Sequence, residues 1–128
     1  MIVIAVMGMS LALLYLMLRY LTLITLTLTA IDHWTTYLCL RVPVEGWVVT
    51  EANPIANKLF SLVGLGPGLV IDSVITLSAI LFLFATPLFS RNSKIGLLVL
   101  ITLTTGYAVV NNIGAITLMG LAPWSESL

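Results

Sequence analysis

The residues of this chain best suited to chemistry are carboxyl and carboxamide side chains set in or beside long apolar stretches. They are Asp32, Glu51, Asn53, Asp72 and Asn112. A charged side chain at the centre of a membrane helix costs about 2.5–3.5 kcal/mol on insertion scales, so an ionisable residue there is by default a functional candidate. Oxygen ligands of this kind suit Ca²⁺, Mg²⁺ or Mn²⁺, although the sequence does not identify a metal. These five residues form one candidate site for a cation or small polar ligand.

The same polar residues are predicted to converge at one depth in a membrane. At a helix rise of about 1.5 Å per residue, Asp32 lies about 18 Å from the inner end of its span. On the same measure, Asp72 lies about 6 Å below the outer end of the next span, and Asn111 and Asn112 lie about 24–26 Å from the inner side. Glu51 approaches from the outer loop. All of them are therefore expected in or beside the outer half of the membrane.

Three interpretations of this group stay open. In the first, the carboxyl groups are protonated or hydrogen-bonded to Thr and Asn side chains and hold the helices together. In the second, the group binds a hard cation. In the third, a pair of carboxyl groups performs acid–base chemistry or carries protons. His33 is about 100° from Asp32 on the helical wheel and is expected to be an interfacial residue rather than a co-ligand.

A periodic polar face runs along the first apolar stretch. Its members follow one another at alternating intervals of three and four residues, and they are Thr22, Thr25, Thr29, Asp32, Thr36 and Cys39. This spacing places them on one face of a helix. Hydroxyl residues commonly line the interfaces between membrane helices, so we interpret the four threonines as a helix-packing face.

The elements that position these residues must be membrane helices. The chain has 128 residues, of which 60% are hydrophobic and 8% charged, and its formal net charge is zero. A soluble domain carries roughly 25% charged residues, so a soluble monomer is excluded. A nucleic-acid-binding protein needs a basic face, and disorder needs few apolar residues, so both classes are excluded as well. The length accommodates a single domain over residues 1–128.

We predict an all-α fold, an integral membrane helical bundle with three transmembrane helices and one short interfacial or re-entrant helix. No Pro-Gly turn interrupts residues 1–40, which are therefore expected to form one long helix. A span needs about 20 apolar residues to cross the hydrocarbon region. The three predicted spans are residues 20–40, 68–88 and 95–119.

The segment between the first and second spans is predicted to be irregular, with a loop over residues 41–47. Asn53 suits the N-cap position of a helix, and Pro54 suits the first helical position. These two residues predict a short helix over residues 54–63. A glycine-rich stretch, residues 64–68, is expected to end this helix and begin the next span.

A tight polar turn, residues 90–94, is predicted to join the last two spans, and residues 120–128 are predicted to form a tail. Basic residues in short loops tend to face the cytoplasm. The two basic residues of the 90–94 turn and Arg19 fall on one side of the membrane, against Arg41 and Lys58 on the other. The balance favours a cytoplasmic N-terminus.

No motif for nucleophilic catalysis, phosphate binding or zinc coordination occurs in the sequence. Cys39 is the only cysteine, which excludes an internal disulfide and a multi-cysteine metal site. Whether the protein is an enzyme stays open, with the balance against it. No cofactor is predicted beyond the divalent cation of the second interpretation and bound lipids.

The order of two short motifs resembles an uncharacterised prokaryotic family of small membrane proteins, a domain of unknown function. The motifs are D-x-x-x-T followed by E-x-N-P, at Asp32, Thr36, Glu51, Asn53 and Pro54. The match covers residues 19–116. The resemblance implies a bundle of three to four helices in a prokaryotic cell membrane, and it implies no activity. Members of that family often carry a basic residue in the third helix, where this chain has Asp72.

The leading functional hypothesis is an accessory or structural subunit of a larger membrane protein complex. It rests on the lack of catalytic groups, the small soluble portion and an apolar stretch before Arg19 that one upright crossing does not use. The alternative is a membrane protein that binds a cation or small polar ligand at the outer carboxylate and asparagine site. The expected partners are membrane lipids and other membrane subunits, and no nucleic acid.

Overall fold

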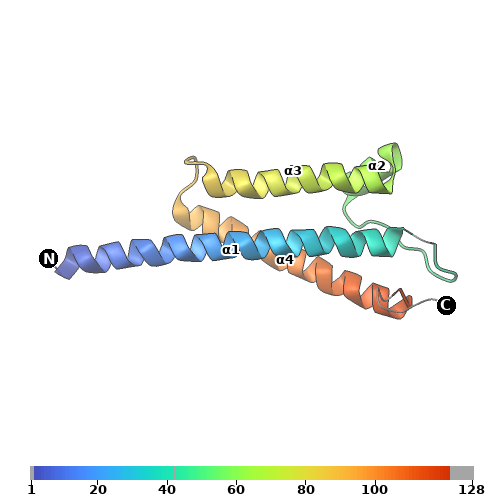
Figure 1. The fold of residues 1–128 in the computed structure, drawn as a ribbon, viewed down its shortest axis with the longest axis horizontal. Coiled ribbons are helices and arrows are strands. Elements are labelled where there is room, and N and C mark those ends of the chain that lie inside the picture. Colours follow the sequence, from blue (N-terminus) through green and yellow to red (C-terminus); the bar gives the residue numbers. More distant parts are fainter. Residues whose placement is uncertain (1, 42, 122–128) are drawn as a thin grey trace.

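The fold is described from a computed structural model, which covers residues 2–41 and 43–121, with side chains from residue 11 onward. In this part of the chain there are four helices and no strands (Figure 1). The helices are α1 (Ile2–Leu40), α2 (Pro54–Val63), α3 (Leu65–Ala85) and α4 (Arg91–Leu118). Three of them, α1, α3 and α4, are long and apolar enough to cross a membrane. The predicted fold class is therefore confirmed.

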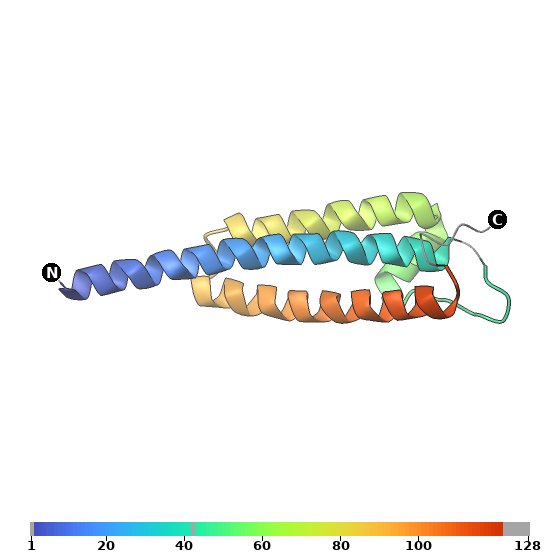
Figure 2. The ribbon, with the colours of Figure 1, turned by 60° about the horizontal axis from the view of Figure 1, so that its bottom comes forward.

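Helix α1 is the centre of the bundle. Both α3 and α4 pack along α1, whereas they make little contact with each other. Figure 1 shows α3 and α4 close together at their connection and diverging toward the opposite end. The N-terminal part of α1 runs beyond both neighbours in Figures 1 and 2. With 39 residues, α1 is about 58 Å long, against about 31 Å for the 21 residues of α3.

Two apolar clusters hold α1 to its neighbours. The cluster near the α3–α4 connection consists of Leu18, Ile80, Leu83 and Leu98. The cluster near the far end consists of Leu38, Cys39, Ile116 and Met119. Between the clusters the buried positions of α1 include Thr22, Thr25 and Thr29. The Thr25 and Thr102 hydroxyl oxygens lie 2.7 Å apart, so part of the threonine face contacts α4 directly.

Local sequence explains where α2 begins and ends. The Asn53 side-chain oxygen accepts a hydrogen bond from the Ile55 backbone N–H at 3.0 Å, and Pro54 is the first helical residue. Gly64 ends the helix with a φ of +89°, a conformation that L-residues with a side chain rarely adopt. The predicted range of 54–63 is the observed one.

The bounds of α3 and α4 differ from those predicted. Helix α3 starts three residues earlier than the predicted span of 68–88, because Gly64 alone breaks the chain. It also ends three residues earlier, because Thr86 is extended before Pro87. Helix α4 starts at Arg91, so the predicted turn over residues 90–94 is wrong. Ser90 caps α4 by accepting a hydrogen bond from the Ser93 backbone N–H at 3.2 Å, which draws the polar residues into the first helical turn. Most of the predicted tail, residues 122–128, lies outside the described residues.

Candidate functional site

The predicted site residues line one pocket of about 450 Å³ between α1, α3 and α4, with α2 and the preceding loop at its edge. All five contribute to its lining: Asp32, Glu51, Asn53, Asp72 and Asn112. His33 and Thr29 line it as well. No lysine or arginine in the described part of the chain belongs to this lining. Three carboxyl groups against a single histidine give the lining an acidic character.

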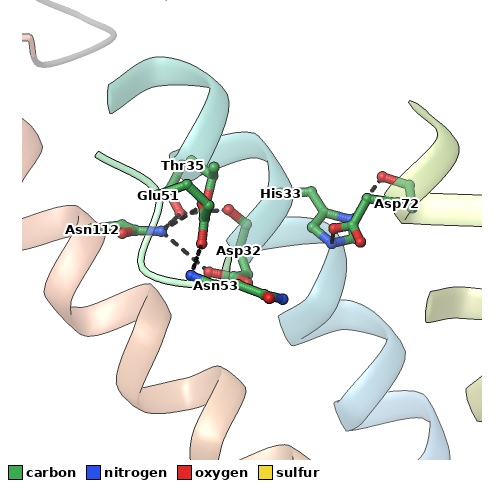
Figure 3. A network of polar contacts seen from close by, with 9 residues as sticks. Asp32, His33, Thr35, Glu51, Asn53, Asp72 and Asn112 are labelled. Carbon is green, nitrogen blue, oxygen red and sulfur yellow. Dashed lines mark hydrogen bonds and ion pairs between the residues drawn. The ribbon is translucent and has the colours of Figure 1, made fainter. Parts of the chain in front are cut away.

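Asp32 reaches α4 through Asn112. The Asn112 side-chain N–H group donates to the Asp32 Oδ1 atom at 3.2 Å, and Thr35 and Thr36 hydroxyl oxygens accept from the same nitrogen at 3.2 and 3.1 Å (Figure 3). The Cys39 thiol donates to the Asn112 backbone carbonyl at 3.7 Å. This network lies in the part of the α1–α4 interface far from the α3–α4 connection. It gives Asp32 a packing role and leaves its second carboxylate oxygen for another partner.

His33 points to the other flank of α1 and reaches α3 (Figure 3). Its Nε2 atom lies 3.2 Å from the Asp72 Oδ2 atom, and its Nδ1 atom lies 2.7 Å from the Ser73 hydroxyl oxygen. The sequence predicted an interfacial role for His33 and missed this pair. The sequence nevertheless indicated the direction of the His33 side chain, because a residue about 100° from Asp32 on the helical wheel must face a different neighbour.

Ser73, His33 and Asp72 have the hydrogen-bond order of a nucleophile, a base and an orienting acid. Ser73 sits in the middle of α3 and does not belong to the lining of the pocket. The backbone N–H groups around it are committed to the helix, so they cannot stabilise an oxyanion. The three residues therefore act as a polar clamp between α1 and α3.

Glu51 and Asn53 organise the chain entry into α2. The Glu51 Oε1 atom accepts a hydrogen bond from the Asn53 backbone N–H at 2.8 Å, and Asn53 in turn caps α2. The E-x-N-P sequence thus has a local structural explanation. It also holds the Glu51 carboxylate at the edge of the pocket, where Ala56 and Phe60 of α2 complete the lining.

Thr29 is the residue whose environment is least satisfied. Its side chain is 2% exposed, and its hydroxyl has no hydrogen-bond partner among the residues that the structure describes. Thr22 and Thr25, on the same face, donate to backbone carbonyls four residues earlier. A buried hydroxyl without a partner costs about 1–3 kcal/mol. The Thr29 hydroxyl thus lies beside the pocket, buried and without a partner among the described residues.

The size of the pocket indicates the kind of ligand it can hold. Pockets of about 300–1,000 Å³ are typical for organic molecules, and this one falls within that range. In the described residues, no group of three or more His, Cys, Asp and Glu side chains is arranged to hold a metal ion. The arrangement can neutralise a positive charge and offer a hydroxyl and an amide to a polar ligand.

No family model, curated protein or solved structure matches this chain. The resemblance seen in the D-x-x-x-T and E-x-N-P motifs therefore stays a prediction, and the function has to be argued from the pocket.

Proposed function

We propose that this chain is a membrane protein that binds a small organic cation, such as an amine, in the pocket between α1, α3 and α4. The observation that carries the proposal is the convergence of three carboxyl groups on one pocket of about 450 Å³. Binding of a cation or a small polar ligand is the alternative hypothesis from the sequence. A small organic cation is both charged and polar, so this proposal is a narrower form of that hypothesis.

Each of two sides of the pocket contributes one aspartate side chain. Asp32 from α1 and Asp72 from α3 are half-buried, and each uses one carboxylate oxygen for the contact with its neighbouring helix. Because a buried charge is stable only when it is paired, a bound ammonium group would stabilise the ionised carboxylates. In the orientation that the basic residues favour, with the N-terminus in the cytoplasm of a prokaryotic cell, the ligand would enter from outside.

The proposal is tested by thermal unfolding of the purified protein in detergent, with choline and putrescine as probes. The neutral controls are dimethylbutanol, the carbon isostere of choline, and butanediol. We expect both cations to raise the unfolding temperature and both neutral molecules to leave it unchanged. A stabilisation of equal size by the neutral molecules contradicts the proposal. Stabilisation by MgCl₂ alone, reversed by a chelator, also overturns it, in favour of a metal site.

Matched variants locate the binding. Asp32→Asn and Asp72→Asn keep the acceptor oxygens that Asn112 and His33 contact, but they remove the charge. We expect each to weaken cation binding roughly tenfold, since a hydrogen bond to a charged group contributes about 1.5–3 kcal/mol. Glu45→Gln removes an exposed carboxylate outside the pocket and should bind as the natural protein does. An equal loss of cation binding in Glu45→Gln would show that binding depends on the overall charge of the protein and not on the pocket.

The accessory-subunit hypothesis remains the second candidate, because one feature of the fold favours it. The N-terminal part of α1 runs beyond α3 and α4 (Figure 2). Apolar side chains toward this end of α1, such as Leu11 and Leu13, are exposed. A neighbouring subunit would cover this surface. The two proposals are compatible, because they use opposite ends of α1.

A further inference from the structure

The end of the bundle at the α3–α4 connection holds a second pocket, of about 460 Å³, with a basic lining. Arg91 and Lys94, from the first turn of α4, are its charged residues, and Tyr15, Phe84 and Phe89 supply aromatic walls. No carboxyl side chain in the described part of the chain belongs to this lining. The charge of this pocket is thus opposite to that of the first.

Lys94 is buried, with 8% of its surface exposed. Its ammonium group donates a hydrogen bond to the Phe84 backbone carbonyl at 2.8 Å, near the end of α3, where carbonyls lack a partner within the helix. The ammonium group has three hydrogens, so this bond leaves donors for another acceptor. Lysine at a membrane boundary normally extends toward water, and a buried position is therefore unusual.

No acidic side chain in the described part of the chain neutralises the positive charge at this pocket. Within residues 2–41 and 43–121, the ion pair between His33 and Asp72 is the one observed, so neither Arg91 nor Lys94 has an acidic partner there. Burying an unpaired charge is costly. An anion in the pocket would remove that cost for Lys94.

Arg91 adds the geometry that a phosphate group requires. It is the first residue of α4, and its guanidinium donates to the Leu11 backbone carbonyl at 3.4 Å, which leaves most of its donors for another acceptor. The planar guanidinium binds phosphate oxygens through paired hydrogen bonds. The N-terminus of α4 also favours negative charge. Three features, a buried ammonium, a guanidinium and a helix N-terminus, thus meet at one cavity.

We propose that this second pocket binds a phosphate group, and that an anionic membrane lipid supplies it through its headgroup. The pocket lies where α3 ends and α4 begins, which is the boundary level of two helices of spanning length. The neighbouring Leu88 is 78% exposed, so an acyl chain would find apolar surface beside the headgroup site. Basic pockets between membrane helices are known to bind anionic headgroups.

The proposal is tested by lipid binding to the purified full chain, with phosphatidylglycerol and phosphatidylcholine as probes. In native mass spectrometry from detergent, we expect phosphatidylglycerol to remain bound in preference to phosphatidylcholine. Inorganic phosphate is the third probe. If inorganic phosphate alone raises the unfolding temperature as much as phosphatidylglycerol does, the site is supported but its ligand is a free phosphate. Equal retention of the two lipids, with no effect of phosphate, overturns the proposal.

Three variants separate a site from a general surface effect. Lys94→Gln and Arg91→Gln should each weaken phosphatidylglycerol binding roughly tenfold, the loss expected for one charged hydrogen bond. Arg41→Gln is the matched control, because Arg41 is exposed, follows the opposite end of α1 and does not line the pocket. Equal losses in all three variants contradict a defined site. If Lys94→Gln fails to fold, Arg91→Gln alone decides, since Arg91 is exposed and its removal leaves the buried contact intact.

Discussion

Two consecutive residues, Asp32 and His33, hold α1 against different helices. Asp32 accepts from Asn112 on α4, and His33 pairs with Asp72 on α3. Hydrogen bonds between membrane helices contribute about 0.6 kcal/mol on average and up to about 1.7 kcal/mol. Since α3 and α4 make little contact with each other, these pairs through α1 maintain the arrangement in which the first pocket forms.

The sequence predicted one side of this arrangement and missed the other. The alternation of three and four residues identified the face with Thr22, Thr25, Thr29 and Asp32, because that face is continuous along α1. His33 does not belong to this periodic face, and its contact with Asp72 becomes visible only when α3 is seen to lie on a second side of α1. The burial of Lys94 could not be predicted either, because its partner is the Phe84 backbone carbonyl, and every residue type has a backbone carbonyl.

A test at the residue scale compares Asn112→Ala with Asn111→Ala. The Asn112 side-chain nitrogen lies within hydrogen-bond distance of three oxygens of α1, whereas Asn111 is exposed and makes no side-chain hydrogen bond among the described residues. We expect Asn112→Ala to lower the free energy of unfolding by about 1–2 kcal/mol, because the Asp32 carboxylate loses its donor. Asn111→Ala should change it by less than about 0.5 kcal/mol. Reversible unfolding in mixed micelles measures both, and similar losses would deny the Asn112 network any special role.

At the scale of the helices, capping residues decided which bounds the sequence could predict. Asn53 and Pro54 stand next to each other and act only on their own helix, so the start of α2 was predictable. Ser90 also caps a helix, but Arg91 to Lys94 follow it as a polar run that is equally typical of a loop. In the structure the Ser90 cap begins α4 at this run, and Lys94 within it donates to the Phe84 carbonyl of α3, a contact made only in the folded bundle.

The contact between α2 and α3 depends on Gly68, which leads to a prediction for this pair of helices. A Cβ atom at Gly68 would lie 2.6 Å from the Phe60 Cδ1 atom and 3.3 Å from the Phe60 Cα atom, whereas at Gly66 it would meet nothing within 4 Å. Gly68→Ala should lower the free energy of unfolding by about 1–3 kcal/mol through overpacking. Gly66→Ala should raise it by about 0.4–1 kcal/mol, since it restricts the unfolded chain.

The measurement for the glycine pair is chemical unfolding together with amide hydrogen exchange over α2. Exchange should accelerate in α2 for Gly68→Ala alone, because the added methyl group displaces Phe60 from α3. Since Phe60 lines the first pocket, the same variant should also weaken binding of the choline probe. Slow exchange in α2 together with unchanged stability would show that Phe60 moves aside without cost.

At the scale of the whole molecule, two pockets of opposite charge lie at opposite ends of the bundle. The acidic residues Asp32, Glu51 and Asp72 gather at one pocket, and Arg91 and Lys94 gather at the other. Composition alone predicted a membrane protein, and the depth estimate predicted that the acidic residues share a level. The basic pocket needed the packed helices, because Lys94 turns inward only against α3.

The last prediction concerns the N-terminal part of α1, which extends past the rest of the bundle (Figure 1). Helix α1 is about 58 Å long, nearly twice the roughly 30 Å of a bilayer core, and Leu13 in its N-terminal part is 61% exposed.

If this surface packs on another subunit, purification from native membranes in mild detergent should recover a larger partner in stoichiometric amount. Leu13→Gln should release the partner, because a buried amide without a hydrogen bond disrupts an apolar interface. Leu103→Gln changes an equally exposed leucine of α4, 67% exposed, and should retain it. A monodisperse chain without a partner at native abundance, or equal release by both variants, would leave the extension without an interface role.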